Sequence, residues 1–187
     1  MNRQKVIRLG VNAVGFQAVW LASILGAAHD MPWTGLAVVA AYVPVHLILS
    51  PTVRADMALL VFFGLAGTAL DSIYAMTDLI DYRGELIGGA LAPPWISALW
   101  VGFGLSLTGS MAWLTINPLV SALACGIAGT AAYGIGVLAG SARMMTDALT
   151  GYGVVGVMWA LVGLSAAFLV PKLLAREEDR LSQQKCG

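Results

Sequence analysis

Charged residues are scarce in this sequence. Only 11% of its 187 residues are Asp, Glu, Lys or Arg, whereas soluble globular domains carry about 25%. Hydrophobic residues make up 59% of the chain, and the mean hydropathy is +0.83. So few charged side chains cannot shield so large a hydrophobic interior from water, which excludes an ordinary soluble domain. We therefore expect most of the chain to be surrounded by lipid.

Cysteine and histidine are equally scarce, with two residues of each. Cys125 lies in a hydrophobic run and Cys186 in the polar C-terminal tail, so we expect no disulfide between them. The sequence has no HExxH, GxSxG, P-loop or cysteine cluster. A GxGxxG match at 151–156 follows no predicted strand, so it does not indicate a nucleotide-binding site. Basic and acidic residues balance at ten each. We expect no metal, no cofactor and no nucleic-acid partner.

Long hydrophobic runs are what the sequence does contain. A helix needs about 20 mostly hydrophobic residues to cross a bilayer, and prolines such as Pro32, Pro51 and Pro118 mark ends of such runs. The predicted spans are residues 6–26, 32–49, 55–76, 94–114, 118–139 and 150–169, with Pro171 after the last. The sequence thus predicts an all-α, polytopic bundle of six transmembrane helices as one domain over 1–171. A polar tail follows over 172–187.

The first hydrophobic run admits two interpretations. A basic start, a hydrophobic stretch and the small residues 26–28 are also the pattern of a cleaved signal peptide. Asn12 and Gln17 interrupt that stretch, and its length suits a complete span. We favour a retained first helix.

The distribution of Lys and Arg predicts the orientation. With six spans, both termini lie on the same side of the membrane. Eight of the ten basic residues then fall on the side of the termini, and only Arg83 and Arg143 fall on the other. The eight are Arg3, Lys5, Arg8, Arg54, Lys172, Arg176, Arg180 and Lys185. The positive-inside rule predicts cytoplasmic termini and tail, in a multi-pass protein of a bacterial inner membrane.

Asp71 lies inside the third hydrophobic run, and Tyr74 and Asp78 follow it at helical spacing. An ionisable side chain in a membrane costs about 2.5–3.5 kcal/mol on insertion scales, which makes it a candidate functional residue. Counting about 1.5 Å per residue places aromatic and polar side chains of other spans near its depth. The candidate pocket, near the outer face, comprises Gln17, Trp20, Asp71, Tyr74, Trp100 and Tyr133. A structural alternative stays open, in which Asp71 is protonated or ties helices together through hydrogen bonds.

A second polar group lies nearer the cytoplasmic side. It comprises Asn12, Tyr42, His46, Ser110, Asn117 and Ser121. His46 and Asp71 differ in depth by more than about 10 Å, so we do not expect them to form an acid–base pair. For Asn12, Gln17 and His46 we favour structural contacts over ligand binding.

Other aromatic residues and glycines are interpreted structurally. Aromatic side chains near span ends are typical membrane-interface anchors. Small residues in the fifth span, including the GxxxG of Gly136 and Gly140, predict close packing against neighbouring helices. The predicted anchors are Trp33, Tyr82, Trp95, Trp113 and Tyr152.

Several stretches carry a resemblance to a known family. They are NAVGFQAVW at 12–20, Asp71, PPWISALWVGF at 93–103, and the glycine-rich region 126–140 with Tyr133. In these the chain resembles a bacterial inner-membrane family catalogued as a domain of unknown function (number 2878). The resemblance implies a small multi-span protein of undefined activity. It also implies an association with lipid modification or envelope stress, because genes of such proteins often neighbour those of cyclopropane-fatty-acid-synthase-like proteins.

Three functions remain open from the sequence. The first is an accessory or scaffold protein of membrane-lipid modification, which binds a lipid or a partner enzyme. The second is a membrane-embedded enzyme that acts on a lipid with Asp71 as acid or base. The third is a small transporter or channel. We rank them in this order, because catalytic motifs and an inverted repeat are both missing.

Overall fold

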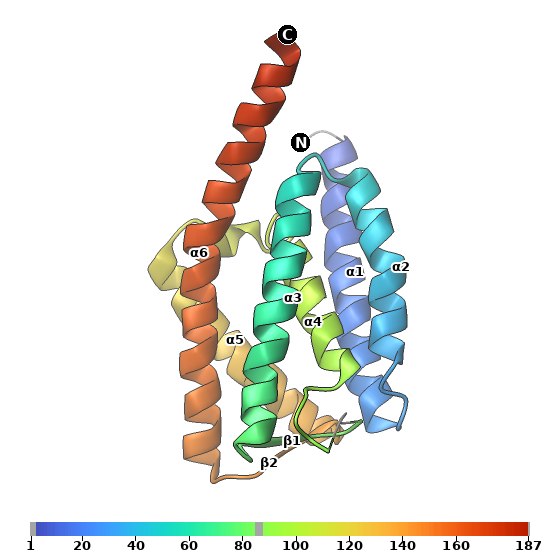
Figure 1. Cartoon of the computed structure of the whole chain (residues 1–187), viewed down its shortest axis with the longest axis vertical. Coiled ribbons are helices and arrows are strands. Elements are labelled where there is room, and N and C mark those ends of the chain that lie inside the picture. The colour runs from blue at the N-terminus through green and yellow to red at the C-terminus, as the bar shows by residue number, and fades with distance from the viewer. Residues whose placement is uncertain (1–2, 85–87, 187) are drawn as a thin grey trace.

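The computed structural model describes residues 3–84 and 88–186 and folds them into a helical bundle (Figure 1). Within these ranges the α-helices are α1 (Arg3–Ala28), α2 (Thr34–Leu49), α3 (Val53–Met76), α4 (Pro94–Ser106), α5 (Pro118–Ala139) and α6 (Ala148–Cys186). A 3₁₀ helix, η1 (Ala112–Thr115), and two short strands, β1 (Ile80–Tyr82) and β2 (Ala142–Met144), complete the described elements. The helical fold predicted from hydrophobicity is confirmed, but the strands were not predicted.

Four helices in the described ranges are long and hydrophobic enough to cross a membrane, namely α1, α3, α5 and α6. The other two are shorter, with 16 residues in α2 and 13 in α4. At about 1.5 Å per residue, α4 extends for about 20 Å, less than a bilayer core of about 30 Å. The described helices are thus compatible with a membrane protein, and two of the six predicted spans are short helices.

The fourth predicted span differs most from expectation. A continuous helix over 94–114 was predicted, but α4 ends at Ser106, and a turn leads into η1. The backbone N–H of Ser110 donates instead to the buried side chain of Asn12, at 2.7 Å. Irregular backbone is tolerated at membrane depth only where protein satisfies its polar groups. Asn12 of α1 supplies that partner, which hydrophobicity alone does not reveal.

The sixth helix is longer than predicted. It begins after Asp147, whose carboxylate accepts the backbone N–H of Thr150 at 3.0 Å, and this hydrogen bond lowers the pKa of Asp147. It then continues through Pro171 to Cys186. Proline removes one backbone hydrogen bond, but the residues that follow are mostly strong helix formers. The tail therefore prolongs α6 beyond the bundle (Figure 1).

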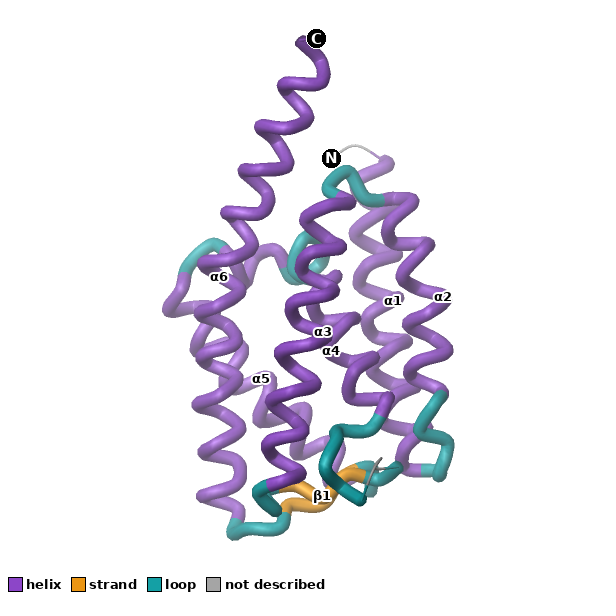
Figure 2. The backbone as a smooth tube through the Cα atoms, in the orientation of Figure 1, coloured by secondary structure: helices purple, strands orange, loops and turns teal. Residues whose placement is uncertain are grey.

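The two ends of the bundle differ in structure. Helix α1 begins and helix α6 ends on the same side of the bundle, here called the terminal end (Figure 1). At the other, the sheet end, β1 and β2 pair antiparallel, with Tyr82 opposite Ala142 (Figure 2). The pairing joins the loop after α3 to the loop after α5. Two loops that are far apart in the sequence therefore form one cap across this end.

Packing divides the bundle into two parts. α1 packs against α2 and α4, and α3 packs against α4, while α5 packs mainly along α6. Gly129 of α5 lies directly against the indole of Trp159, where a Cβ would overlap the ring. Gly140 instead ends α5 in a left-handed conformation, with φ of 82°. Close packing of the fifth span is thus confirmed, through Gly129 rather than the Gly136–Gly140 pair.

Candidate functional site

Asp71 lies fully buried on α3, between three hydrogen-bond donors from the described residues. Its Oδ1 accepts the hydroxyl of Tyr133 and the hydroxyl of Tyr82, each at 2.5 Å. Its Oδ2 accepts the indole N–H of Trp100 at 2.6 Å. Strand β1 and helices α3, α4 and α5 therefore meet at one carboxylate. Depth counting had placed Trp100 and Tyr133 at this level.

Tyr82 is the partner that sequence reasoning missed. It was predicted to be an interface anchor, but only 3% of the residue is exposed. Burial, followed by the nearby Asp71, raises the pKa of Tyr82 well above its ordinary value, so the phenol keeps the proton that it donates. Trp95 was also predicted to be an anchor and is likewise buried, with its indole N–H bound to the carbonyl of Arg83 at 2.9 Å. Pairing of β1 with β2 accounts for both errors, because it folds the loop back over the bundle.

Tyr74 and Asp78, which follow Asp71 at helical spacing in the sequence, do not join it at the cavity. α3 ends at Met76, so Asp78 follows the helix, with a positive φ of 52° and an exposed side chain. Tyr74 is buried beside the ring of Tyr133, at a centroid distance of 6.2 Å, and does not line the cavity described next. Its hydroxyl has no hydrogen-bond partner among the described residues. Of the three polar residues at helical spacing, α3 therefore contains Asp71 and Tyr74 but not Asp78.

A cavity of about 660 Å³ lies between α1, α4, α5 and α6. Its lining includes five of the six predicted pocket residues, namely Gln17, Trp20, Asp71, Trp100 and Tyr133. It runs from Tyr82 near the sheet end to Ser110, Met111 and Trp113 near the terminal end. Its polar lining residues are Gln17, Asp71, Tyr82, Ser110 and Tyr133, and the others are hydrophobic or small.

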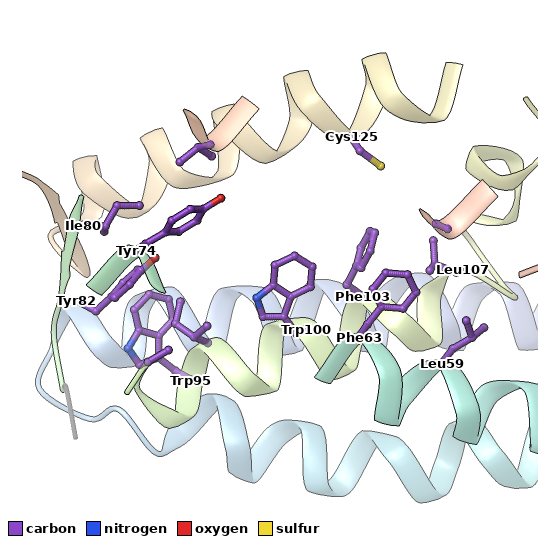
Figure 3. Packing of buried hydrophobic residues seen from close by; sticks show 14 of the residues in the cluster. Leu59, Phe63, Tyr74, Ile80, Tyr82, Trp95, Trp100, Phe103, Leu107 and Cys125 are labelled. Atoms are coloured by element: carbon purple, nitrogen blue, oxygen red, sulfur yellow. The ribbon is translucent and has the colours of Figure 1, made fainter. Parts of the chain in front are cut away.

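Aromatic side chains dominate the cavity wall. Nine of the 27 lining residues are aromatic, or one third, against 9% in the whole chain. Trp100 stacks on Trp159 with ring centroids 4.7 Å apart and an interplanar angle of 14°. Figure 3 shows Trp100 and Phe103 projecting from α4 toward α5, where Cys125 faces them. Stacked and edge-packed rings make this wall stiff.

The cavity opens sideways, between α1 and α5. These helices make few direct contacts, because α1 packs on α2 and α4 while α5 packs on α6. Four lining residues along this gap are themselves exposed, Gln17 on α1 and Ala128, Ala131 and Ile135 on α5. In a membrane, such an opening faces the hydrocarbon chains of lipids rather than water.

The second polar group forms a separate buried network around Asn12. The Asn12 Oδ1 accepts the hydroxyl of Ser110 at 2.6 Å as well as its backbone N–H. The Asn12 Nδ2 donates to the carbonyl of Leu105 at 3.0 Å and to the hydroxyl of Tyr42 at 3.0 Å. These partners fix the orientation of the amide, since Ser110 N–H can only donate and Leu105 C=O can only accept. Asn12 thus ties α1 to α2 and to the end of α4.

His46 completes the network and contacts a carboxylate other than Asp71. Its Nδ1 lies 3.2 Å from the Asn12 Nδ2 and 3.4 Å from the hydroxyl of Tyr42. Its Nε2 lies 3.3 Å from the Oδ2 of Asp56. Asp56 is fully buried and also accepts the hydroxyls of Ser50 and Thr108. Among the described residues the side-chain partners of His46 are Asn12, Tyr42 and Asp56, and those of Asp71 are Tyr82, Trp100 and Tyr133. The sequence analysis missed Asp56, which meets His46 across the turn between α2 and α3.

Asn117 and Ser121 do not belong to this network. Asn117 is exposed and caps α5, accepting the backbone N–H groups of Leu119 and Val120 at 2.9 and 3.2 Å. Ser121 is buried and donates to the carbonyl of Gly163 on α6, at 2.7 Å. An Asn before a Pro-initiated helix is a common N-cap, and that signal was available in the sequence.

A family model described as a protein of unknown function (DUF2878) matches residues 9–164. The chain belongs to this family. No curated protein and no solved structure matches the chain. The region matched by the family model contains the whole cavity lining, from Ala13 to Trp159, and both polar networks. The resemblance carried by the 12–20 and 93–103 stretches is thereby confirmed.

Within this family fold, the chemistry at Asp71 is restricted. Its two oxygens already face three donors, and no part of the residue is exposed. A general acid or base must reach the proton that it transfers, directly or through one water. Asp71 is better placed to hold Tyr82, Trp100 and Tyr133 in the cavity wall. No group of three or more metal-ligating side chains occurs among the described residues.

Proposed function

We propose that this chain is a multi-pass protein of a bacterial inner membrane that binds the apolar part of a membrane lipid. The observation that carries the proposal is the 660 Å³ cavity, which is hydrophobic and opens between α1 and α5. Ligand sites are typically cavities of about 300–1,000 Å³ with few polar groups, and this one has that size and character. A sideways opening gives a ligand a route from the bilayer without crossing water.

The role that we propose for the bound lipid is that of an accessory protein. The chain would hold the lipid for a partner enzyme that modifies it, and the partner would approach from the membrane or from the protruding part of α6. The enclosure of Asp71 supports an accessory role over catalysis, since the residue is fully buried and both carboxylate oxygens already accept hydrogen bonds.

The proposed arrangement in the membrane has six crossings with cytoplasmic termini. α2 and α4 would each cross with help from flanking segments, α4 through the turn and η1 that follow it. The terminal end carries Arg3, Lys5, Arg8 and Arg54, whereas Arg83 and Arg143 lie at the sheet end and pair with Asp30 and Asp81. The charge difference between the ends supports a cytoplasmic terminal end.

Native mass spectrometry in a mild detergent tests lipid binding. The unmodified protein should retain a lipid, and Ala132→Phe, which adds a phenyl ring to the cavity lining, should lose most of it. Ala37→Phe is the matched control, because Ala37 is an exposed residue of α2 outside the lining. It should retain the lipid as the unmodified chain does.

Two outcomes would refute the proposal. One is a protein that carries no lipid from native membranes and takes up none when lipid is added. The other is equal retention by Ala132→Phe and Ala37→Phe, since the retained lipid would then lie outside the cavity.

A further inference from the structure

We propose that the lipid is an uncharged one whose planar head carries carbonyl oxygens, the chemistry of a prenylated quinone. This inference rests on the proposed lipid binding and names its ligand class. Gln17 and Trp20 of α1 are placed to receive the carbonyl oxygens, and the aromatic wall of α4 and α6 faces the ring.

Gln17 and Trp20 are unused hydrogen-bond donors in the cavity. Both line it, and neither side chain makes a hydrogen bond to another residue in the described part of the chain. They are three residues apart on α1, so they are neighbours on one helix face. An indole N–H can only donate, and an unpaired polar group in hydrocarbon costs free energy. A ligand with an acceptor oxygen at this position satisfies both.

The depth of these donors distinguishes between lipid classes. Gln17 is 14 residues from the start of α1 and 11 from its end, or about 21 and 16 Å along the helix. That position lies well inside a hydrocarbon core of about 30 Å. Phospholipid head groups and their esters remain at the polar interface, whereas an uncharged quinone head enters the hydrocarbon region. An acceptor oxygen at this depth therefore fits a quinone.

The lack of positive charge among the described lining residues excludes an anionic head group. The described lining residues contain no Lys, Arg or His. Asp71 belongs to that lining, and a carboxyl group offers an anion no compensating positive charge. A phosphate or free carboxylate placed here would lose its hydration without gaining a cationic partner to offset its charge. The ligand is uncharged where it meets the cavity.

The wall favours a flat ring over a saturated chain alone. Five of the six tryptophans line the cavity. Trp100, Trp159 and Phe103 pack against one another, with Phe103 edge-on to Trp159 at 5.3 Å. Stacked rings present rigid, planar surfaces, and offset stacking contributes beyond the burial of area. A saturated chain would gain only the free energy of burying its hydrophobic surface.

Binding of decyl-ubiquinone to the purified full chain in nanodiscs tests the inference, with hexadecane as the ring-free probe. The unmodified protein should bind decyl-ubiquinone. Gln17→Leu and Trp20→Phe should each weaken that binding about two- to tenfold, the loss of one hydrogen bond. Neither variant should change hexadecane binding, and circular dichroism should show both folded. Ala132→Phe should block both probes.

The outcomes separate this inference from the function on which it rests. If hexadecane binds and the two variants leave decyl-ubiquinone binding unchanged, the quinone assignment is wrong and lipid binding stands. If phosphatidylglycerol displaces decyl-ubiquinone at equal concentration, the uncharged class is wrong. If the unmodified protein binds neither probe, or binds both as well as Ala132→Phe does, lipid binding in the cavity fails as well.

Discussion

Asp71 is the residue on which the cavity wall depends. Its carboxylate accepts hydrogen bonds from β1, α4 and α5 while it belongs to α3. Placing a polar group in a hydrophobic interior costs free energy unless it is paired. Here pairing is complete, so we assign the acid a structural role in holding the aromatic wall.

Replacing Asp71 by Asn tests this role. The amide keeps the shape but presents an NH₂ group to a donor, which leaves at least one buried donor unpaired. We expect a loss of about 1–3 kcal/mol in the free energy of unfolding, measured by denaturant titration in detergent. Asp30→Asn is the control, because Asp30 is exposed and has a φ of 61°, which Asn tolerates. Equal stability of the two variants would contradict the account of Asp71.

Two amides on α1 provide a second matched comparison. Asn12 is fully buried and makes hydrogen bonds to Tyr42, Leu105 and Ser110. Gln17 is exposed and makes none within the described residues. Asn12→Leu should therefore cost about 2–4 kcal/mol of unfolding free energy, and Gln17→Leu should change it by less than about 0.5 kcal/mol. Comparable losses in both variants would show that the Asn12 network does not stabilise the fold.

For individual residues, the sequence predicted some of the contacts around Asp71 and missed others, and the difference has a physical reason. Trp100 and Tyr133 were found because helices translate sequence position into depth, and partners of a buried carboxylate lie at one depth. Tyr82 and Asp56 were missed because their positions depend on loops. Tyr82 returns to the bundle through strand pairing, and Asp56 meets His46 across the short turn between α2 and α3.

Among the elements, α4 and α5 determine the cavity. α4 is short because Ser110 finds its partner in Asn12, so the chain can leave the helix inside the bundle. α5 approaches α6 at Gly129, which allows Trp159 to reach Trp100. Hydrophobic run length predicted the existence of both elements, but it carries no information on where a helix breaks.

Gly129→Ala tests the contact between α5 and α6. A Cβ there would overlap the indole of Trp159, which must then move away from Trp100. We expect a loss of about 1–3 kcal/mol in unfolding free energy and a changed near-ultraviolet circular dichroism signal. Gly134→Ala on the same helix is the control, since its Cβ would come no closer than 4.0 Å to Tyr152. That variant should be as stable as the unmodified chain, or more stable by up to about 1 kcal/mol.

A neutral effect of Gly129→Ala would contradict this packing. It would mean that α5 and α6 lie further apart than described, and the cavity wall formed by Trp159 would lose its support.

For the whole molecule, the division of the bundle is the central feature. α1 to α4 form one packed unit, α5 and α6 form another, and the cavity lies between α1 and α5 where the two meet. The sheet end holds the units together through β1 and β2, and Asp71 does so within the bundle.

The sequence predicted the helical bundle and its hydrophobic surroundings, but not this gap. A gap depends on which helices fail to pack, and composition does not encode that directly.

The most direct measurement is photo-crosslinking in bilayers with a lipid that carries a diazirine in its chain, followed by mapping of the adducts. Adducts should concentrate on cavity residues such as Trp20, Trp100 and Cys125, and Ala132→Phe should remove them. Residues on the outer face of α5, such as Ile127 and Leu138, should be labelled equally in both proteins. Labelling confined to that outer face, and unchanged by Ala132→Phe, would contradict lipid binding in the cavity.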